Sequence, residues 1–304
     1  MGLKFQRHFK LTVQGKNGDT LEFNDPLTLE FTIIRNAQAS MQTGSFRLYN
    51  LNQTSRGNIY RNKTDYDDVR TLKLQAGYDY QNPLPTIFSG CVTEAYSVRN
   101  SGSPDFITNI MGYDFNFSVV KSFSNFTKSP DQSNPTVTRQ QIINLLVEDL
   151  IKNTPGNTLK KGTIGTFEGE YPRGRTIFGP TWDALKTETN RQCFIDNGRV
   201  FCLPEDEAVE GNIKVINSST GLLSTPKKRE TYLDIEVLFE PCVDMGQQIF
   251  LESVSSPQFN GYYKVLGIQH QGIISGAVSG KCTTILTLDY GSRLLGLTTE
   301  SVTG

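Results

Sequence analysis

The chain has 304 residues, 37% of them hydrophobic, and carries 30 Lys and Arg against 31 Asp and Glu. This composition excludes a disordered protein and suffices for two or three domains with ordinary cores. The formal net charge of -1 excludes a global attraction to nucleic acid or to an anionic membrane, so any such contact should be local. No apolar run of membrane-spanning length and no secretory signal pattern occurs, which predicts a soluble protein made in the cytoplasm.

Strand patterns dominate the first 122 residues. In residues 26–34, PLTLEFTII, the side chains of Leu29, Phe31 and Ile33 alternate with polar ones, as in a sheet with one buried face. Further strands are expected in residues 44–51, 69–78, 86–98 and 105–115. A short helix is expected in residues 52–62, with Asn52 or Thr54 as its N-cap.

The middle of the chain has a different pattern. Residues 121–135 are rich in Ser, Asn, Pro and Asp and are predicted to be a linker. Thr138 and Gln141 form a capping-box pattern before apolar residues at helical spacing, and a second helix should begin near Asp183. The segment from Lys160 to Pro180 is predicted to be a long loop, either functional or ordered by a partner.

A hairpin is predicted in CFIDNGRVFC, where Asn197 and Gly198 form a two-residue turn. Counting outward from the turn places Cys193 opposite Cys202 at a non-hydrogen-bonded pair, where a disulfide is geometrically feasible. The chain has five cysteines without a C-x-x-C pair, and in a reducing cytosol two packed thiols are the favoured interpretation.

Strand patterns return in the last hundred residues, at 211–217, 232–241, 247–254, 262–272 and 281–291. Residues 88–100, FSGCVTEAYSVRN, and residues 259–272, FNGYYKVLGIQHQG, both begin Phe-x-Gly and continue as one long strand. The strands before them (72–78 and 249–254) and after them (108–114 and 283–291) also correspond in order. The two β-rich ends are therefore predicted to be copies of one barrel or sandwich, and three such chains would form a pseudo-hexagonal ring.

Chemical sites are weakly supported. His8 and His270 have no second ligand at metal-binding spacing, and the pair Glu168 and Glu170 is more typical of a hydrated loop than of an acid and base. Residues 156–163, GNTLKKGT, lack the phosphate-loop spacing, and residues 65–68, DYDD, lack most positions of a calcium loop. No catalytic, cofactor-binding or metal-binding residue is predicted, and His270 is expected to be a strand-end residue.

Two basic clusters remain, one at residues 227–229 and one formed by Arg173 and Arg175. They are expected to be solvated loops or contacts with an acidic neighbouring subunit.

Several stretches together resemble a known family: residues 217–230, 232–253, 259–272 and 283–288 near the C-terminus, and residues 27–36 and 44–62 near the N-terminus. They resemble baseplate hub proteins of contractile-tailed bacteriophages, which are related to the tail-tube fold. The resemblance implies a homotrimer with two tube-like β-barrels per subunit, which matches a hexameric tail tube on one side and a trimeric central spike on the other. The chain is shorter than the hub of the large T-even phages, so its middle domain should be reduced.

The resulting expectation is a mainly β protein, α+β overall, with two tail-tube-like β-barrel domains at residues 1–122 and 206–304 flanking a small α+β domain at residues 123–205. The expected function is that of a structural, non-enzymatic trimeric hub of the virion tail baseplate, assembled in the host cytoplasm. Its expected partners are the tail tube, the central spike, the tape-measure protein and the baseplate wedge proteins, with DNA only as transient cargo and no membrane.

Two alternatives to the hub remain open. A peripheral tail β-protein that binds a host receptor or glycan would have a shallow aromatic-lined pocket. A cell-wall hydrolase would need catalytic residues that the sequence does not present.

Overall fold

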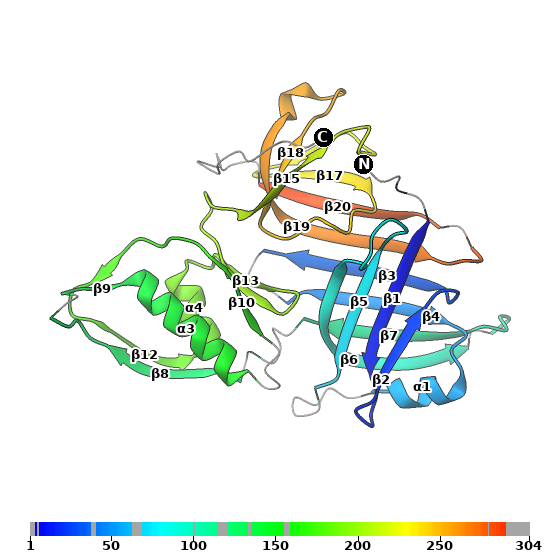
Figure 1. Ribbon diagram of the computed structural model, residues 1–304, viewed down its shortest axis with the longest axis horizontal. Helices are drawn as coiled ribbons and strands as arrows, with labels where there is room; N and C mark the ends of the chain where they lie inside the picture. The colour runs from blue at the N-terminus through cyan, green and yellow to red at the C-terminus, as the bar shows by residue number, and fades with distance from the viewer. Residues whose placement is uncertain are drawn as a thin grey trace.

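The computed structural model in Figure 1 describes residues 4, 6–37, 41–62, 69–99, 101–114, 119, 121–132, 135–154, 159–278 and 280–289. The protein is mainly β, as predicted, with helices in the minority. Three clusters of buried apolar side chains form its cores. We refer to the N-terminal unit (β1–β7 with α1), the middle unit (β8–β14 with α3 and α4) and the C-terminal unit (β15–β20).

The N-terminal unit is a folded sheet with one short helix. Its elements are β1 (Arg7–Gln14), β2 (Thr20–Asn24), β3 (Leu29–Asn36), β4 (Thr43–Tyr49), α1 (Gln53–Ile59), β5 (Thr71–Tyr78), β6 (Thr86–Arg99) and β7 (Phe106–Tyr113). The alternation predicted in β3 is confirmed, because Leu29, Phe31 and Ile33 are buried and their neighbours are not. Asn52 is the N-cap of α1, as predicted, and its side chain accepts from the Ser55 amide at 2.8 Å.

In Figure 1, β1 and β5 lie in front of β3, β4 and β7. The first core fills the space between these layers with large side chains such as Phe9, Phe31, Phe46 and Phe88. One face of β3, β4 and β7 is therefore committed to the core, which leaves their other face outside.

The middle unit combines two helices with small sheets. Its elements are β8 (Phe123–Lys128), β9 (Val137–Thr138), α3 (Arg139–Asn153), β10 (Lys160–Ile164), β11 (Glu170–Tyr171), β12 (Arg175–Pro180), α4 (Thr181–Glu188), β13 (Cys193–Asp196) and β14 (Arg199–Cys202). The capping box is confirmed, because Thr138 and Gln141 bond each other's backbone amides at the start of α3. The helix near Asp183 is also confirmed as α4.

Two loop predictions in this unit are wrong. The linker predicted at residues 121–135 contains β8, and the loop predicted from Lys160 to Pro180 contains β10, β11 and β12. β8 pairs with β12 in an antiparallel ribbon, which buries Ile177 in the middle core and leaves Phe178 75% exposed. Because only one side of this ribbon faces a core, its polar composition looks like that of a loop.

The predicted hairpin is confirmed with its register. Asn197 and Gly198 both have positive φ, at 47° and 75°, as a two-residue turn of this type requires. Cys193 lies opposite Cys202, and both are buried free thiols rather than a disulfide.

The C-terminal unit consists of β15 (Val209–Ile216), β16 (Lys227–Arg229), β17 (Tyr232–Leu238), β18 (Gln247–Leu251), a 3-10 turn (Pro257–Phe259), β19 (Gly261–Ile274) and β20 (Cys282–Asp289). Leu233, Ile235 and Val237 of β17 are buried in the third core, as their alternation predicted.

The two β units share one sheet. Its strand order is β16-β17-β20-β19-β3-β4-β7-β6-β5-β1-β2, with β18 beside β19 and β15 beside β18. The joint between the units is the antiparallel pairing of β3 with the C-terminal half of β19.

The strand order of the two units is the same. The N-terminal unit has β3-β4-β7-β6-β5 and the C-terminal unit has β16-β17-β20-β19-β18, in matching chain order. The three pairs of strands matched in the sequence therefore occupy equivalent positions. The next strand in each unit differs in direction, because β1 is antiparallel to β5 whereas β15 is parallel to β18.

A bulge marks the true correspondence between β6 and β19, which both have 14 residues. The register shifts after Val92 in β6 and after Val265 in β19, so these two valines are equivalent. Phe88 lies four residues before Val92, and Gly261 lies four residues before Val265, so Phe88 corresponds to Gly261 rather than to Phe259. The Phe-x-Gly triplet was thus the wrong marker, displaced by two residues, although the strands that it identified are equivalent.

Candidate functional surfaces

One face of the shared sheet is continuous across seven strands, from β17 through β20, β19, β3, β4 and β7 to β6. The registers place one set of alternating residues on this outward face. They are Tyr232, Asp234, Glu236, Leu238, Thr283, Ile285, Thr287, Asp289, Gly267, Gln269, Gln271, Ile273, Glu30, Thr32, Ile34, Asn36, Thr43, Ser45, Arg47, Tyr49, Ile107, Asn109, Met111, Tyr113, Glu94, Tyr96 and Val98.

The outward face is rich in amides and hydroxyls and poor in bases. Among the positions named, Arg47 is the only basic one, against five acidic ones, and it forms an ion pair with Glu30 on the neighbouring strand at 3.2 Å. The edge strand β16 adds Lys227 and Arg229 to the same side of the sheet. Lys281, immediately before β20, pairs with Glu236 at 2.5 Å. A phosphate chain passing over these positions would therefore meet no unpaired base among them.

A buried ion pair connects all three units at the joint. Arg35 of β3 is 1% exposed, and its guanidinium donates two hydrogen bonds to Asp196 of the middle unit, at 2.8 and 2.5 Å. The same guanidinium lies 3.5 Å from the carboxylate of Asp244 in the C-terminal unit. Burial is the largest single effect and lowers the pKa of Arg35, but the charges of Asp196 and Asp244 and their hydrogen bonds together outweigh it, so the net pKa is raised.

Gln42 strengthens this joint, because its amide nitrogen donates to the backbone carbonyl of Ile195 at 2.8 Å. Sequence reasoning missed both Arg35 and Asp196. The sequence did hold a signal for Arg35. The alternation predicted for β3 places position 35 on the same buried side as Leu29, Phe31 and Ile33. A positively charged side chain at such a buried position needs a buried acidic partner to offset the cost of removing it from water.

His270 lies in the interior of β19 and is fully buried, so its prediction as a strand-end residue is wrong. Its Nδ1 is 2.9 Å from the Thr284 hydroxyl, and its ring meets the Phe239 ring edge-on. Burial, together with the positive charge of Arg35, lowers the pKa of His270 to about 3. A neutral, enclosed imidazole of this kind is a packing residue.

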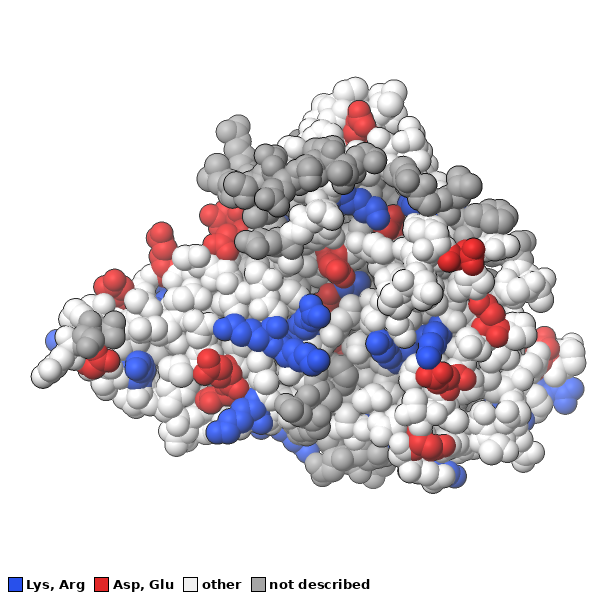
Figure 2. All heavy atoms as spheres, in the orientation of Figure 1, with Lys and Arg blue, Asp and Glu red and all other residues white. Residues whose placement is uncertain are grey.

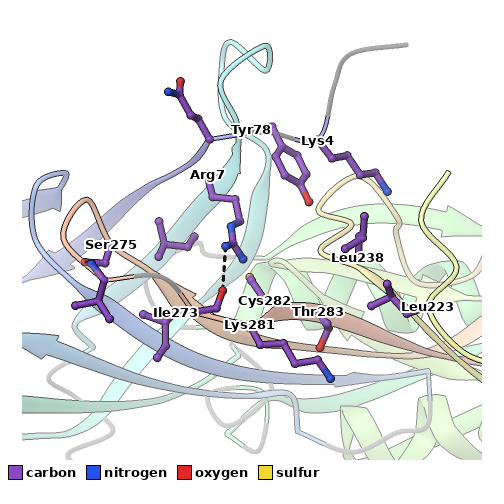
Figure 3. A pocket seen from close by; sticks show the side chains of 14 residues that line it. Lys4, Arg7, Tyr78, Leu223, Leu238, Ile273, Ser275, Lys281, Cys282 and Thr283 are labelled. Atoms are coloured by element: carbon purple, nitrogen blue, oxygen red, sulfur yellow. Dashed lines mark hydrogen bonds between the residues drawn. The ribbon is translucent and has the colours of Figure 1, made fainter. Parts of the chain in front are cut away.

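A groove of about 490 Å³ lies between the N-terminal unit and the C-terminal unit (Figure 3). Arg7 donates to the carbonyl of Gly280 at 3.0 Å across it. Its other bases are also engaged, since Lys4 pairs with Glu240 at 2.9 Å and Lys281 with Glu236. The three bases that line the groove are thus all engaged in contacts within the chain.

A second groove, of about 520 Å³, lies where the three units meet. Lys73, Lys161 and Arg199 line it, and Figure 2 shows Lys and Arg side chains gathered over this part of the visible face. In the described part of the chain, no acidic side chain pairs with Lys73 or Arg199. Asp196 and Asp244, the two acidic residues that contact Arg35, also line the groove, so it carries charges of both signs with bases in slight excess.

The other candidate positions are separate from one another. His8 is partly exposed on β1 and lies 2.7 Å from Asp25, while Glu168 and Glu170 are exposed near β11. Arg175 pairs with Glu188 at 2.8 Å, and Arg229 of β16 pairs with Asp234.

Residues 65–68 and 155–158 lie outside the described residues. Within the described ranges, no three His, Cys, Asp or Glu side chains are placed to hold a metal ion. No described helix combines the length and apolar character needed to cross a membrane.

Comparison with known proteins shows similarity to one family model over part of the chain. Residues 175–274, less than half of the chain, match a family model described as "Baseplate hub gp41". No curated protein matches the sequence. The matched segment begins at β12 and ends with β19, so it includes residues 217–230, 232–253 and 259–272 of the stretches that resemble phage hubs, but not residues 283–288.

Solved structures share the fold over almost the whole chain. A tail protein from Neisseria meningitidis MC58 aligns with a TM-score of 0.58 at 9% identity, covering 92% of this chain and 96% of that one. The 43 kDa tail protein of prophage MuSo2 from Shewanella oneidensis aligns with a TM-score of 0.54 at 8% identity, covering 92% and 98%.

A third structure with this fold is the E. coli c3393 protein, described as a type VI secretion component similar to the T4 tail proteins gp27 and gp5. It aligns with a TM-score of 0.53 at 10% identity, covering 95% of this chain and 78% of that one. The resemblance predicted from the sequence is confirmed, and the matched family and these tail proteins are structural components rather than enzymes.

Proposed function

We propose that this chain, a structural protein of the phage tail and baseplate, is a trimeric hub that joins the hexameric tail tube to the trimeric central spike. The observation that carries the proposal is the repeated strand order of the two β units within one sheet. Two equivalent units in each of three chains present six similar elements to a six-fold tube while the assembly keeps true three-fold symmetry.

The two β units are proposed to be tube-like barrel domains, residues 1–122 and 206–304, with residues 123–205 as the domain between them. Three separate cores support this division. The buried contact of Arg35 with Asp196 and Asp244 would keep the three domains at fixed angles, which a symmetry adapter requires.

The outward face of the seven strands is proposed to line the central passage. DNA and the tape-measure protein must move through a hub, and exposed bases would retain the phosphates of the DNA. The five acidic positions and the one paired base on these seven strands suit transit. In this arrangement DNA is a transient cargo.

The test is assembly of the full-length protein with its tail tube subunit. Light scattering should give a mass of three chains, and electron microscopy should show three-fold rings, two equivalent densities per chain, at the ends of short tubes. A monomer that neither trimerises nor caps tubes would overturn the proposal. Receptor or glycan binding by such a monomer would instead support a peripheral tail role.

A further inference from the structure

We propose that the β16–β17 hairpin of one copy adds to the open edge of β6 in the next copy, so that chains are joined in the same way as the two units within one chain. This inference rests on the proposed trimer and assigns its interface.

The joint within the chain provides the template. β18 pairs with β19 only as far as Lys264, before the bulge. After the bulge, β3 takes over that side of β19, from the pair of Gly267 with Asn36 to the pair of Ile274 with Leu29. The C-terminal half of β19 thus accepts the edge strand of the other β unit.

β6 has the same construction, but its edge is open. β5 pairs with β6 as far as Cys91, and after the bulge a single bridge covers Ala95, whose amide and carbonyl exchange 2.8 Å bonds with Arg61. Bonding directions alternate along a strand, so the backbone groups of Ser97 and Arg99 point to the same side as those of Ala95. Among the described residues, no backbone group pairs with them on that side.

A shallow groove accompanies this open edge. It has a volume of about 510 Å³ and lies between β6 and α1, lined by Gln53, Arg56, Gly57, Tyr60, Ser97 and Phe106. The guanidinium of Arg56 lies 3.8 Å from the centre of the Phe106 ring, which gives the groove a flat wall. The groove provides room for an added strand beside β6.

The strand that fits is the counterpart of β3, which is β16. It ends the described sheet on the side opposite to β2. β16 is antiparallel to β17, as β3 is to β4, so it would meet β6 in the antiparallel sense in which β3 meets β19.

The registers also specify which residues would meet. Ile33 of β3 and Lys228 of β16 are equivalent. Following the cross-strand pairs over two strands leads from Ile33 to a residue of β7 and from Lys228 to the equivalent residue of β20. Ile33 pairs with His270, and His270 is equivalent to Ser97 by its distance from the bulge. Lys228 of one copy should therefore lie opposite Ser97 of the next.

The neighbouring pair is Lys227 with Val98, both exposed in the single chain. Lys227 and Arg229 share a side of β16, which would extend the outward face beyond Val98. That face carries acidic positions in excess, including Glu94 on the same strand. Charge thus favours the joint, and a contact between two different edges can close into a ring.

The experiment is a disulfide trap in the full-length protein. Val98→Cys and Lys227→Cys are combined in a Cys242→Ser background, which removes the exposed native thiol. The register makes this a non-hydrogen-bonded pair, whose Cα atoms approach to about 4.5 Å, close enough for a bridge. Mild oxidation should yield covalent trimers on a non-reducing gel. The control combines Val98→Cys with Lys152→Cys, an exposed position at the end of α3.

The outcomes separate the two proposals. Trimers in light scattering that do not crosslink, or that crosslink equally in the control, would overturn the interface and leave the hub standing. A protein that stays monomeric even with the tube subunit would overturn both. As a second variant, Ser97→Pro removes one edge donor and should weaken association about tenfold relative to Ser97→Ala, which also lacks the 2.9 Å bond to the Thr108 hydroxyl but keeps the edge donor. Unchanged association would contradict the joint.

Discussion

Arg35 and Asp196 lie 161 residues apart in the sequence and form a two-bonded ion pair that is almost entirely enclosed. Removing Asp196 leaves the buried Arg35 with only the longer 3.5 Å contact to Asp244, and breaking a buried ion pair costs about 3–5 kcal/mol. We expect Asp196→Asn to lower the free energy of unfolding by an amount in this range, as measured by urea titration.

The matched control is the double variant Arg35→Met with Asp196→Leu, which removes both charges and keeps side chains in the space. It should recover most of the loss, because apolar replacement of a buried ion pair is often neutral. A double variant as unstable as the single one would contradict a dominant role for the uncompensated charge.

His270 should make the protein sensitive to acid. Its folded pKa of about 3 lies below the value near 6.5 expected in the unfolded chain, so the unfolded chain takes up a proton that the folded chain refuses. The associated stability is complete above pH 6.5 and is lost as the pH falls towards 3, by on the order of 5 kcal/mol. His270→Gln, which can still bond Thr284, should flatten the dependence of stability on pH between 6.5 and 4. An unchanged slope would be inconsistent with a neutral buried imidazole.

Two glycines should respond in opposite directions to alanine. A Cβ on Gly90 in β6 would lie 2.1 Å from the carbonyl oxygen of Tyr113, so Gly90→Ala must push β6 and β7 apart and should cost about 3 kcal/mol or more. A Cβ on Gly57 in α1 would meet no atom within 4 Å, and Gly57→Ala should stabilise by about 0.5–1 kcal/mol. Thermal melting of the two variants checks both signs.

The thiols should divide into one reactive and four protected groups. Cys242 is exposed, whereas the other four are buried, and burial raises the pKa of Cys193 to about 11 and that of Cys91 to about 12. Titration with a chromogenic disulfide should detect one fast thiol in the native protein and five in urea. Cys242→Ser should abolish the fast one. A second fast thiol in that variant would indicate that a core opens more readily than its burial implies.

Lysines added to the outward face should make it bind DNA. Gln271 and Thr32 are cross-strand neighbours on it, and Gln271→Lys with Thr32→Lys would add two positive charges per chain. Gel-shift assays with duplex DNA should show binding that weakens steeply with salt, which the parent protein lacks. The control places two lysines on the other layer, at Thr12 and Gln75. Equal binding by both variants would rule out a special position for this face.

Local patterns predicted the elements whose determinants are local. The capping box of Thr138 with Gln141 and the turn of Asn197 with Gly198 depend on residues close in sequence, and both were found where predicted. The alternation in β3 likewise specified which side chains enter the core. The order of three matched strands was enough to find the internal repeat.

What the sequence did not reveal depends on distant contacts. The ribbon of β8 with β12 acquires its strand character from pairing between segments about 50 residues apart, and one of its sides stays exposed. Arg35 looked like an ordinary polar strand residue until Asp196 was brought against it. His270 was judged from its polar neighbours, whereas its burial depends on β3 and β20 on either side.

The bulges after Val92 and Val265 make the orientation of two long stretches depend on one residue each. Because side chains alternate, deleting Leu266 would rotate every following position of β19 by half a turn relative to its neighbours. His270 would then be presented to solvent, while Gln269 and Gln271 would be forced into an apolar interior. A length change of a single residue at these places is thus more disruptive than most substitutions, whereas surface connections between strands tolerate insertions and deletions better.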